Sequence, residues 1–269
     1  MQVTLTKRQA LGNDFLVYDL AQGEPGVPWP VLARRWCDRR FGVGADGLLV
    51  LQNLGDRRLV MSLFNADGSS AEISGNGIRC LVQAAHEADG APRDATYEVA
   101  TGAGVRYVSV VDNDGAGVIR ASVDMGVVTD LPVPENWDVL GCQPDRPVAH
   151  VSLGNPHSVV AVDDVSAVPL QDLGEKVPHV NLEIVEPGPE PHAVTMRVHE
   201  RGAGITLACG SGACASAYAA KKWGLVPSST DEVVVHMPGG DASVRIDAVT
   251  KIATLIGPSE FIGTVTVRA

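Results

Sequence analysis

The sequence has few aromatic side chains, only 4% of its 269 residues, whereas hydrophobic residues make up 45%. Its cores must therefore pack aliphatic side chains, and the apolar fraction is too high for a disordered chain. No stretch is long and apolar enough for a signal peptide or a membrane span. We therefore expect a soluble, cytoplasmic protein without membrane contact, and the length predicts two domains of ordinary size.

Charge and cysteine content exclude further classes of protein. The formal net charge is −11, and no long basic run with interleaved aromatics is present, which excludes nucleic acid as a partner. An anionic small molecule stays open as substrate, because backbone dipoles can bind anions locally. The five cysteines are odd in number and irregularly spaced, which argues against a disulfide scaffold. Cys209 and Cys214 have no second pair to complete a zinc site, and P-loop, haem and dinucleotide motifs are missing.

The most informative feature that the chain does contain is an internal repeat. A shift of 135 positions aligns Ser74-Gly-Asn-Gly77 with Cys209-Gly-Ser-Gly212, and Asn65 with Glu200. Upstream, Leu11-Gly-Asn-Asp-Phe15 recurs 142 positions later as Leu153-Gly-Asn-Pro-His157. Two motifs in the same order at nearly the same displacement predict a duplicated domain.

The pattern of helices and strands favours two α/β halves. Ala-rich segments at 76–89 and 211–223, each followed by glycine, predict one long helix in each half, and residues 31–38 predict a shorter one. We place the N-terminal half at 1–122, completed by 258–269, and the C-terminal half at 123–257. Runs rich in β-branched residues and bounded by Gly, Asp or Pro predict strands at 48–51, 58–64, 107–111, 151–153, 158–161, 232–236 and 260–268.

Each repeat places a polar side chain and Gly-x-Gly at the start of a helix. The backbone N–H groups there are unpaired and lie at the positive end of the helix dipole, so such a site binds a carboxylate and lowers the pKa of a thiol. Two such sites could offer an acid/base group to each face of a substrate carbon, as inversion of a stereocentre requires. The residues alone also allow a plainer interpretation, in which both are Gly-rich turns that cap helices and Cys209 is a buried apolar residue.

Other polar residues carry weaker signals when each is taken alone. His157 is typical of a turn, and Glu200 with Arg201 is typical of a surface ion pair. The asparagines fit ordinary turns: Asn65, Asn76, Asn155 and Asn181. The remaining histidines have no motif around them and receive no role: His86, His150, His179, His192, His199 and His236.

Taken together, these motifs resemble the diaminopimelate epimerase family over essentially the whole chain. The resemblance rests on segments spread in order through both halves: 12–15, 41–46, 64–69, 75–80, 154–157, 200–204, 208–213, 238–240 and 257–258. It implies an α/β (α+β) fold of two pseudo-symmetric domains, each a mixed sheet wrapped around a central helix. It also implies an active site in the cleft between the domains.

The resemblance further implies an activity and a set of site residues. The family interconverts LL- and meso-2,6-diaminopimelate, for lysine and peptidoglycan precursors, without pyridoxal phosphate or a metal, and a homodimer is expected. Position 74 and Cys209 would form the catalytic pair, with His157 and Glu200 tuning their pKa. The substrate-binding groups would be Asn13, Asn65, Gly75, Asn76, Asn155, Asn181, Glu200, Arg201, Gly210 and Ser211.

The chain departs from the family pattern at several positions. Ser74 stands where the family has cysteine, and Cys80, six residues further along the helix, is a poor substitute. Gly47 stands where some members have a substrate-contacting glutamine, and Ala10 replaces a common glycine.

Ser74 changes the expected energetics. A thiol has a pKa near 8.5 and a hydroxyl is closer to water's value of roughly 15.7. The gap of roughly seven units makes a serine anion about 10 kcal/mol harder to form, and a helix terminus recovers only about 0.3–2 kcal/mol. We therefore expect Cys209 to abstract a proton and Ser74 to donate one, with slow or direction-biased epimerisation.

Three other activities stay open on the sequence. The chain could be a related proline- or hydroxyproline-type racemase or dehydratase, or a ligand-binding homologue impaired by Ser74. Asn155, Asn181 and Arg201 favour a substrate with a second zwitterionic end over a proline-type substrate. A thiol hydrolase built on Cys209 and His157 would need a base placed for acyl transfer.

Overall fold

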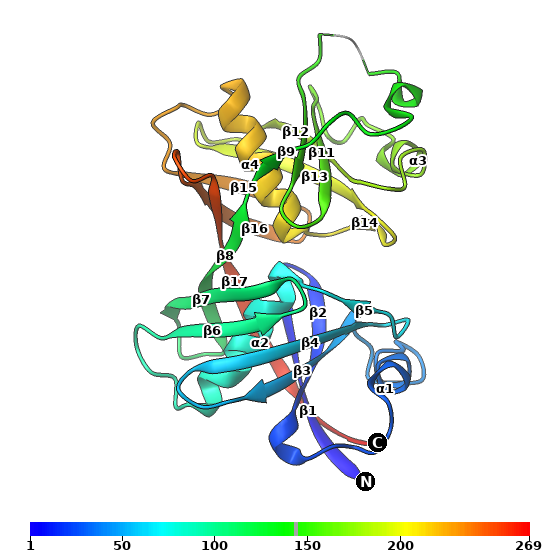
Figure 1. Ribbon diagram of the computed structural model, residues 1–269, viewed down its shortest axis with the longest axis vertical. Helices are drawn as coiled ribbons and strands as arrows, with labels where there is room; N and C mark the ends of the chain where they lie inside the picture. The colour runs from blue at the N-terminus through cyan, green and yellow to red at the C-terminus, as the bar shows by residue number, and fades with distance from the viewer. Residues whose placement is uncertain (143–144) are drawn as a thin grey trace. The chain divides into compact units, whose positions relative to one another are not determined.

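The computed structural model describes residues 1–142 and 145–269, and these divide into two compact units (Figure 1). Unit 1 comprises Met1–Val123 together with Gly257–Ala269, and unit 2 comprises Asp124–Ile256. The chain passes from one unit to the other within two long strands, β8 (Val118–Val127) and β17 (Ile252–Arg268).

Unit 1 consists of strands around one long helix. In chain order its elements before β8 are β1 (Gln2–Ala10), β2 (Asn13–Asp19), the short 3₁₀ helix η1 (Leu20–Gln22), α1 (Trp29–Trp36), β3 (Gly47–Asn53), β4 (Arg58–Asn65), β5 (Ser70–Ala71), α2 (Gly75–Ala88), β6 (Thr96–Thr101) and β7 (Gly104–Asn113). The end of β17 returns to this unit and pairs with β1 in antiparallel register, from Gln2 opposite Arg268 to Gln9 opposite Glu260.

Unit 2 also consists of strands around one long helix. Its elements before β17 are β9 (Thr129–Asp130), the 3₁₀ helix η2 (Trp137–Leu140), β10 (Val148–Ser152), β11 (Pro156–Ala161), α3 (Leu170–Gly174), β12 (Asn181–Pro187), β13 (Ala193–Glu200), β14 (Gly204–Thr206), α4 (Gly210–Trp223), β15 (Glu232–Met237) and β16 (Gly240–Ile246).

The two units repeat one order of strand pairing. In unit 1, β1/β2 is antiparallel, β2/β3 parallel, β3/β4 antiparallel, β4/β6 parallel and β6/β7 antiparallel. In unit 2, β10/β11, β11/β12, β12/β13, β13/β15 and β15/β16 repeat this series. Helix α2 follows the short strand β5, and α4 follows the short strand β14. The duplication that the sequence motifs predict is therefore present in the fold.

Both long helices lie at the centre of their own unit. Eleven of the 14 residues of α2 are buried, and α2 contacts β1, β2, β3, β4 and β7. Helix α4 contacts β10, β11, β12, β13, β15 and β16, and its buried residues are all Gly, Ala, Ser or Cys. A helix with strands on several sides needs no wide polar face, and small side chains let the strands approach closely.

The predicted fold class is confirmed: the structure is a mixed α+β fold, with a mixed sheet around a central helix in each unit. The predicted helices at 31–38, 76–89 and 211–223 appear as α1, α2 and α4, shifted by at most two residues. Gly224 ends α4 with φ +72°, the left-handed conformation that glycine adopts without strain. In the described part of the chain, every helix is too short or too polar to cross a membrane.

Candidate active-site residues

Ser74 and Cys209 occupy the same position in their two units, as the residue that precedes the central helix. Ser74 has φ −137° and ψ 124°, and Cys209 has φ −128° and ψ 116°. The Ser74 hydroxyl accepts a hydrogen bond from the N–H of Gly77 at 3.0 Å, and the Cys209 sulfur accepts one from the N–H of Gly212 at 3.3 Å. Each side chain thus caps the positive end of a helix, where an anion is stabilised.

The strands below the two helix starts carry different side chains at equivalent places. Phe15 lies opposite Gly47 in the β2/β3 pair, and His157 lies opposite Asn181 in the β11/β12 pair. A Cβ on Gly77 would lie 3.4 Å from Phe15. A Cβ on Gly212 would instead lie 2.7 Å from Glu183 Oε1. The helix start of unit 1 therefore rests on apolar side chains, and that of unit 2 rests on a carboxyl group.

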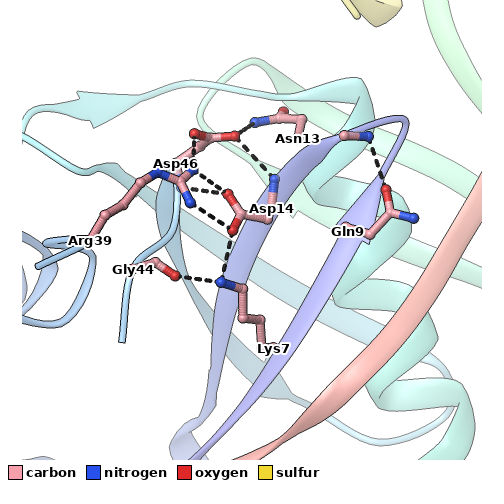
Figure 2. A network of polar contacts seen from close by, with 8 residues as sticks. Lys7, Gln9, Asn13, Asp14, Arg39, Gly44 and Asp46 are labelled. Atoms are coloured by element: carbon pink, nitrogen blue, oxygen red, sulfur yellow. Dashed lines mark hydrogen bonds and ion pairs between the residues drawn. The ribbon is translucent and has the colours of Figure 1, made fainter. Parts of the chain in front are cut away.

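Asn13 belongs to a charged network on the surface of unit 1 (Figure 2). Its amide nitrogen donates to Asp46 Oδ2 at 2.7 Å, and its amide oxygen accepts from Asn76 at 3.4 Å. Arg39 binds Asp46 and Asp14, each at 2.7 Å. Burial opposes ionisation of Asp14, but hydrogen bonds and charge from Arg39 and Lys7 outweigh it and lower the pKa of this carboxyl. The network therefore fixes the Asn13 amide nitrogen against the Asp46 carboxyl group, which Arg39 holds.

His157 and Glu183 form a fully buried pair in unit 2, with no side-chain exposure at either residue. His157 Nδ1 lies 2.6 Å from Glu183 Oε1, and His157 Nε2 lies 3.1 Å from Asn155 Oδ1. The Asn155 amide nitrogen in turn donates to the Ser211 hydroxyl at 3.3 Å. Burial raises the pKa of Glu183 despite the neighbouring His157. Through Asn155, the pair therefore connects strands β11 and β12 to the first turn of α4.

The expected lowering of the Cys209 pKa is wrong. Burial raises the pKa of Cys209 well above its usual range, and the charges of Glu200 and Glu183 raise it further. Hydrogen bonds from Ser211 and from the Gly212 N–H lower it, as the helix-start argument requires, but they do not outweigh burial. The helix terminus can be recognised from neighbouring residues, whereas the two carboxyl groups reach the site from the distant strands β12 and β13.

Cys80 has an environment unlike that of Cys209. It is fully buried in α2 beside Ser259, and burial raises its pKa to about 11. No helix terminus lies beside it, because it is the sixth residue of α2. This placement agrees with the expectation that Cys80 is a poor substitute for a thiol at position 74.

The other expected binding residues of unit 2 hold the backbone around the site. Asn181 is buried, and its amide donates to the Pro156 carbonyl at 3.0 Å and accepts from the Arg201 N–H at 2.9 Å. Glu200 accepts from the Thr206 hydroxyl at 2.5 Å. In the described part of the chain Glu200 and Arg201 make no ion pair with each other, so the surface-pair interpretation is wrong.

The expected binding residues in unit 1 lie at the ends of β4 and α2. Asn65 ends β4, is exposed, and donates to the Ser69 hydroxyl at 2.9 Å. Gly75 and Asn76 are the first two residues of α2, as Gly210 and Ser211 are of α4. At Gly47 a Cβ would lie 2.9 Å from the Phe64 carbonyl oxygen, so the close approach of β4 excludes the glutamine that some family members have there.

Sequence reasoning missed two residues of this region. Glu183 lies in β12, whose first five residues are all buried, and a lone carboxylate in such an apolar run is the sequence signal that marks it. Asp46 ends a glycine-rich motif that supported the family resemblance, but no contact to Asn13 was expected. Both reach the site through pairings between distant segments.

Comparison with known proteins identifies the family of this architecture. The diaminopimelate epimerase family matches residues 5–130 and 149–262. A diaminopimelate epimerase of Synechococcus elongatus is 40% identical over 266 residues, covering 91% of each chain. A diaminopimelate epimerase of Thermosynechococcus vestitus is 38% identical and covers 96% of this chain and 97% of the relative.

Solved structures of lower identity share the fold. A predicted epimerase from Pseudomonas aeruginosa aligns with a TM-score of 0.77 at 14% identity, over 99% of each chain. A hydroxyproline epimerase from Agrobacterium vitis aligns with a TM-score of 0.64 at 14% identity, covering 99% of this chain and 91% of that one. At this identity the likeness concerns the fold alone.

Proposed function

Because the chain belongs to the diaminopimelate epimerase family, we propose that it interconverts LL- and meso-2,6-diaminopimelate by proton transfer at one α-carbon. The observation that carries the proposal is the matched pair of helix starts. Ser74 and Cys209 have nearly the same backbone conformation and accept the same hydrogen bond from the residue three positions on. Inversion of a stereocentre requires one proton acceptor and one proton donor of this kind, acting on opposite faces.

The two groups divide the work by their chemistry. In one direction the Cys209 thiolate takes the Cα proton, the bonding pair stays on the substrate carbon, and the Ser74 hydroxyl gives a proton to the other face. The cycle closes when the Cys209 thiol loses its proton and the Ser74 alkoxide regains one, with solvent as the proton reservoir. Because an alkoxide is costly, the step at Ser74 limits the rate.

The substrate groups are assigned by charge. The α-carboxylate, on which negative charge develops as the Cα proton leaves, takes the backbone N–H groups of the helix starts at Gly75, Asn76, Gly210 and Ser211. The distal amino-acid end takes polar side chains of both signs: Asn13, Asn65, Asn155, Asn181, Glu200 and Arg201. His157 and Glu200 act on the ionisation of the catalytic groups.

The remaining features of the proposal rest on the family resemblance. We expect the reaction to need neither pyridoxal phosphate nor a metal, and we expect a cytoplasmic homodimer serving lysine and peptidoglycan precursor synthesis. Activity that persists in the presence of a chelator and after removal of carbonyl-reactive cofactors would support the first expectation. Sedimentation of the purified chain tests the expected homodimer.

The decisive experiment follows the Cα–H signal of LL- and meso-diaminopimelate by ¹H NMR in D₂O, and follows stereochemistry separately. We expect epimerisation by the unmodified chain, lost in Cys209→Ala. Cα–H exchange with one isomer but no epimerisation would mean that Ser74 disables the second step. Absence of both from the unmodified chain and from Ser74→Cys would refute the substrate assignment, and turnover of proline-type substrates would then replace it.

A further inference from the structure

The side chains beneath the start of α4 form one continuous hydrogen-bonded chain. It runs from Glu183 through His157 and Asn155 to Ser211, and ends at Cys209, whose sulfur lies 3.6 Å from the Ser211 hydroxyl oxygen. Glu183 Oε1 lies 2.7 Å and the Cys209 sulfur 3.3 Å from the point where a Cβ on Gly212 would stand. Glu183 Oε1 and the Cys209 sulfur, the two ends of this hydrogen-bonded chain, are therefore within about 6 Å of each other.

The protonation of the buried pair, Glu183 and His157, determines which atoms donate and which accept in this hydrogen-bonded chain. Glu183 and His157 are both inaccessible to solvent, and Glu183 Oε2 accepts no hydrogen bond from any described residue. A net charge at such a place is costly, so the pair is neutral as a whole. A neutral pair is either carboxylate with imidazolium or carboxylic acid with imidazole, and in this geometry both forms keep a hydrogen on His157 Nε2.

That hydrogen orients everything beyond it. His157 Nε2–H donates to the Asn155 amide oxygen, so the amide nitrogen must face Ser211. Because the Ser211 oxygen then accepts from Asn155, its own hydrogen is available for the Cys209 sulfur. From His157 Nε2 onward, every donor thus points toward the sulfur, which favours a negative charge there.

The equivalent asparagine of unit 1 has the opposite orientation. The Asp46 carboxylate, held by Arg39, can only accept, so it takes the amide nitrogen of Asn13. The Asn13 oxygen consequently faces Asn76, the counterpart of Ser211. The amide nitrogens of Asn76 and Asn13 therefore both donate away from the helix start, unlike the donors that lead to Cys209.

We propose that Glu183 is a positioning residue for Cys209, which acts through His157 and Asn155 to turn the Ser211 hydroxyl toward the sulfur and so stabilises the thiolate. The proposal rests on the role given above to Cys209. Three groups from the neighbouring strands bear on the charge at the sulfur: His157 from β11, Glu183 from β12 and Glu200 from β13. Burial, Glu200 and Glu183 raise the pKa of Cys209, and the Ser211 hydrogen bond is one of the contacts that lower it.

The test measures thiolate directly, without diaminopimelate. The rate of alkylation of Cys209 by iodoacetamide, followed on its peptide by mass spectrometry at fixed pH, is proportional to the thiolate fraction. Ser211→Ala should slow it about tenfold, the effect of one hydrogen bond to a charged group. Glu183→Leu should slow it at least about threefold, because the anchor of His157 is lost.

Two further variants and one control make the test specific for positioning. Glu183→Gln should stay within about twofold of the unmodified chain, because its amide N–H can donate to His157 Nδ1 and leave the hydrogen on Nε2. Glu183→Leu combined with Ser211→Ala should be no slower than Ser211→Ala alone, since both act on one chain. Glu190→Leu, which removes an exposed carboxylate from the same unit, should have no effect.

Simple electrostatics predicts the reverse. If Glu183 acted only through its charge, both Glu183→Leu and Glu183→Gln would speed alkylation, and that result would overturn the proposal, as would additive effects in the double variant. Circular dichroism confirms folding, and Asn155→Leu breaks the same chain if Glu183→Leu does not fold. An unmodified chain that lacks epimerase activity but shows the expected alkylation pattern would contradict the proposed function and leave this inference standing.

Discussion

Replacing Ser74 by cysteine tests the proposed reaction most sharply, because position 74 has the same backbone geometry as Cys209. The backbone angles of Ser74 match those of Cys209, and a Cβ on the glycine three residues later would lie 3.2 Å from the Cβ of Ser74 or of Cys209. Cysteine should therefore cap α2 as it caps α4. Because sulfur is a weaker acceptor than a hydroxyl oxygen, we expect the free energy of unfolding to fall by no more than about 1 kcal/mol.

The rate should rise considerably. The pKa gap between hydroxyl and thiol sets an upper limit of about 10 kcal/mol, which would apply only if the full charge developed on residue 74. A positioned acid or base contributes typically 10²–10⁴-fold, so we expect Ser74→Cys to epimerise diaminopimelate about 10²–10⁴ times faster. The equilibrium ratio of the isomers cannot change, because both directions cross the same transition states.

The difference between the two isomers that we expect from Ser74 should therefore appear in the rate of hydrogen exchange at Cα. In D₂O, the isomer whose Cα–H faces Cys209 should exchange faster than it epimerises in the unmodified chain, whereas the two rates should converge in Ser74→Cys. Ser62→Cys, an exposed serine of β4, is the matched control and should leave both rates unchanged. A folded Ser74→Cys variant with no gain in epimerisation would show that residue 74 is not the second acid/base.

Three further predictions concern other parts of the structure. Cys209→Ala should reduce Cα–H exchange in both isomers by at least about 10²-fold with little change in circular dichroism, and undiminished exchange would exclude Cys209 as the base. Gly212→Ala should lower the free energy of unfolding by about 1–3 kcal/mol in urea titrations, because the added Cβ would lie 2.7 Å from Glu183 Oε1. An equal loss of stability in Gly77→Ala would contradict this account. Burial opposes protonation of His236, but hydrogen bonds to Glu190 and Asp241 outweigh burial and raise the pKa of His236. Protonated His236 should therefore stabilise the fold below about pH 6.5, and this stabilisation should be lost as the pH rises through the higher pKa of the folded state. Urea midpoints of the unmodified chain and His236→Gln should therefore converge as the pH rises, and the effect should stay below about 1 kcal/mol because the two carboxylates are exposed.

Much of the fold was predictable because its signals are local in sequence. The Gly-x-Gly turns and Ala-rich runs mark the starts of α2 and α4 to within one residue, since helix caps depend on a few neighbouring side chains. The internal repeat predicted two similar units, and the repeated series of strand pairings bears this out. The sequence predicted only the second half of the long strand β17, whose first residues pair with β16 in unit 2.

The candidate site was only partly predictable. Ser74 and Cys209 could be found because they precede the repeated motif, and the asparagines because they belong to motifs of a known family. Glu183 and Asp46 could not be assigned, because their contacts join segments that are distant in the chain. Glu200 and Arg201, neighbours of opposite charge, suggested an ion pair, yet Glu200 binds Thr206 instead.

The sequence by itself determined the duplication, the two capped helix starts and the presence of a hydroxyl in one and a thiol in the other. These follow from residue identity and short-range spacing. Only the tertiary structure decided how each group is surrounded: Phe15 beneath one helix start, Glu183 and His157 beneath the other. Burial and the charges of Glu200 and Glu183 reverse the expected sign of the Cys209 pKa shift. Desolvation and the orientation of buried hydrogen bonds depend on what packs around a group, and strand pairing between distant segments sets that environment.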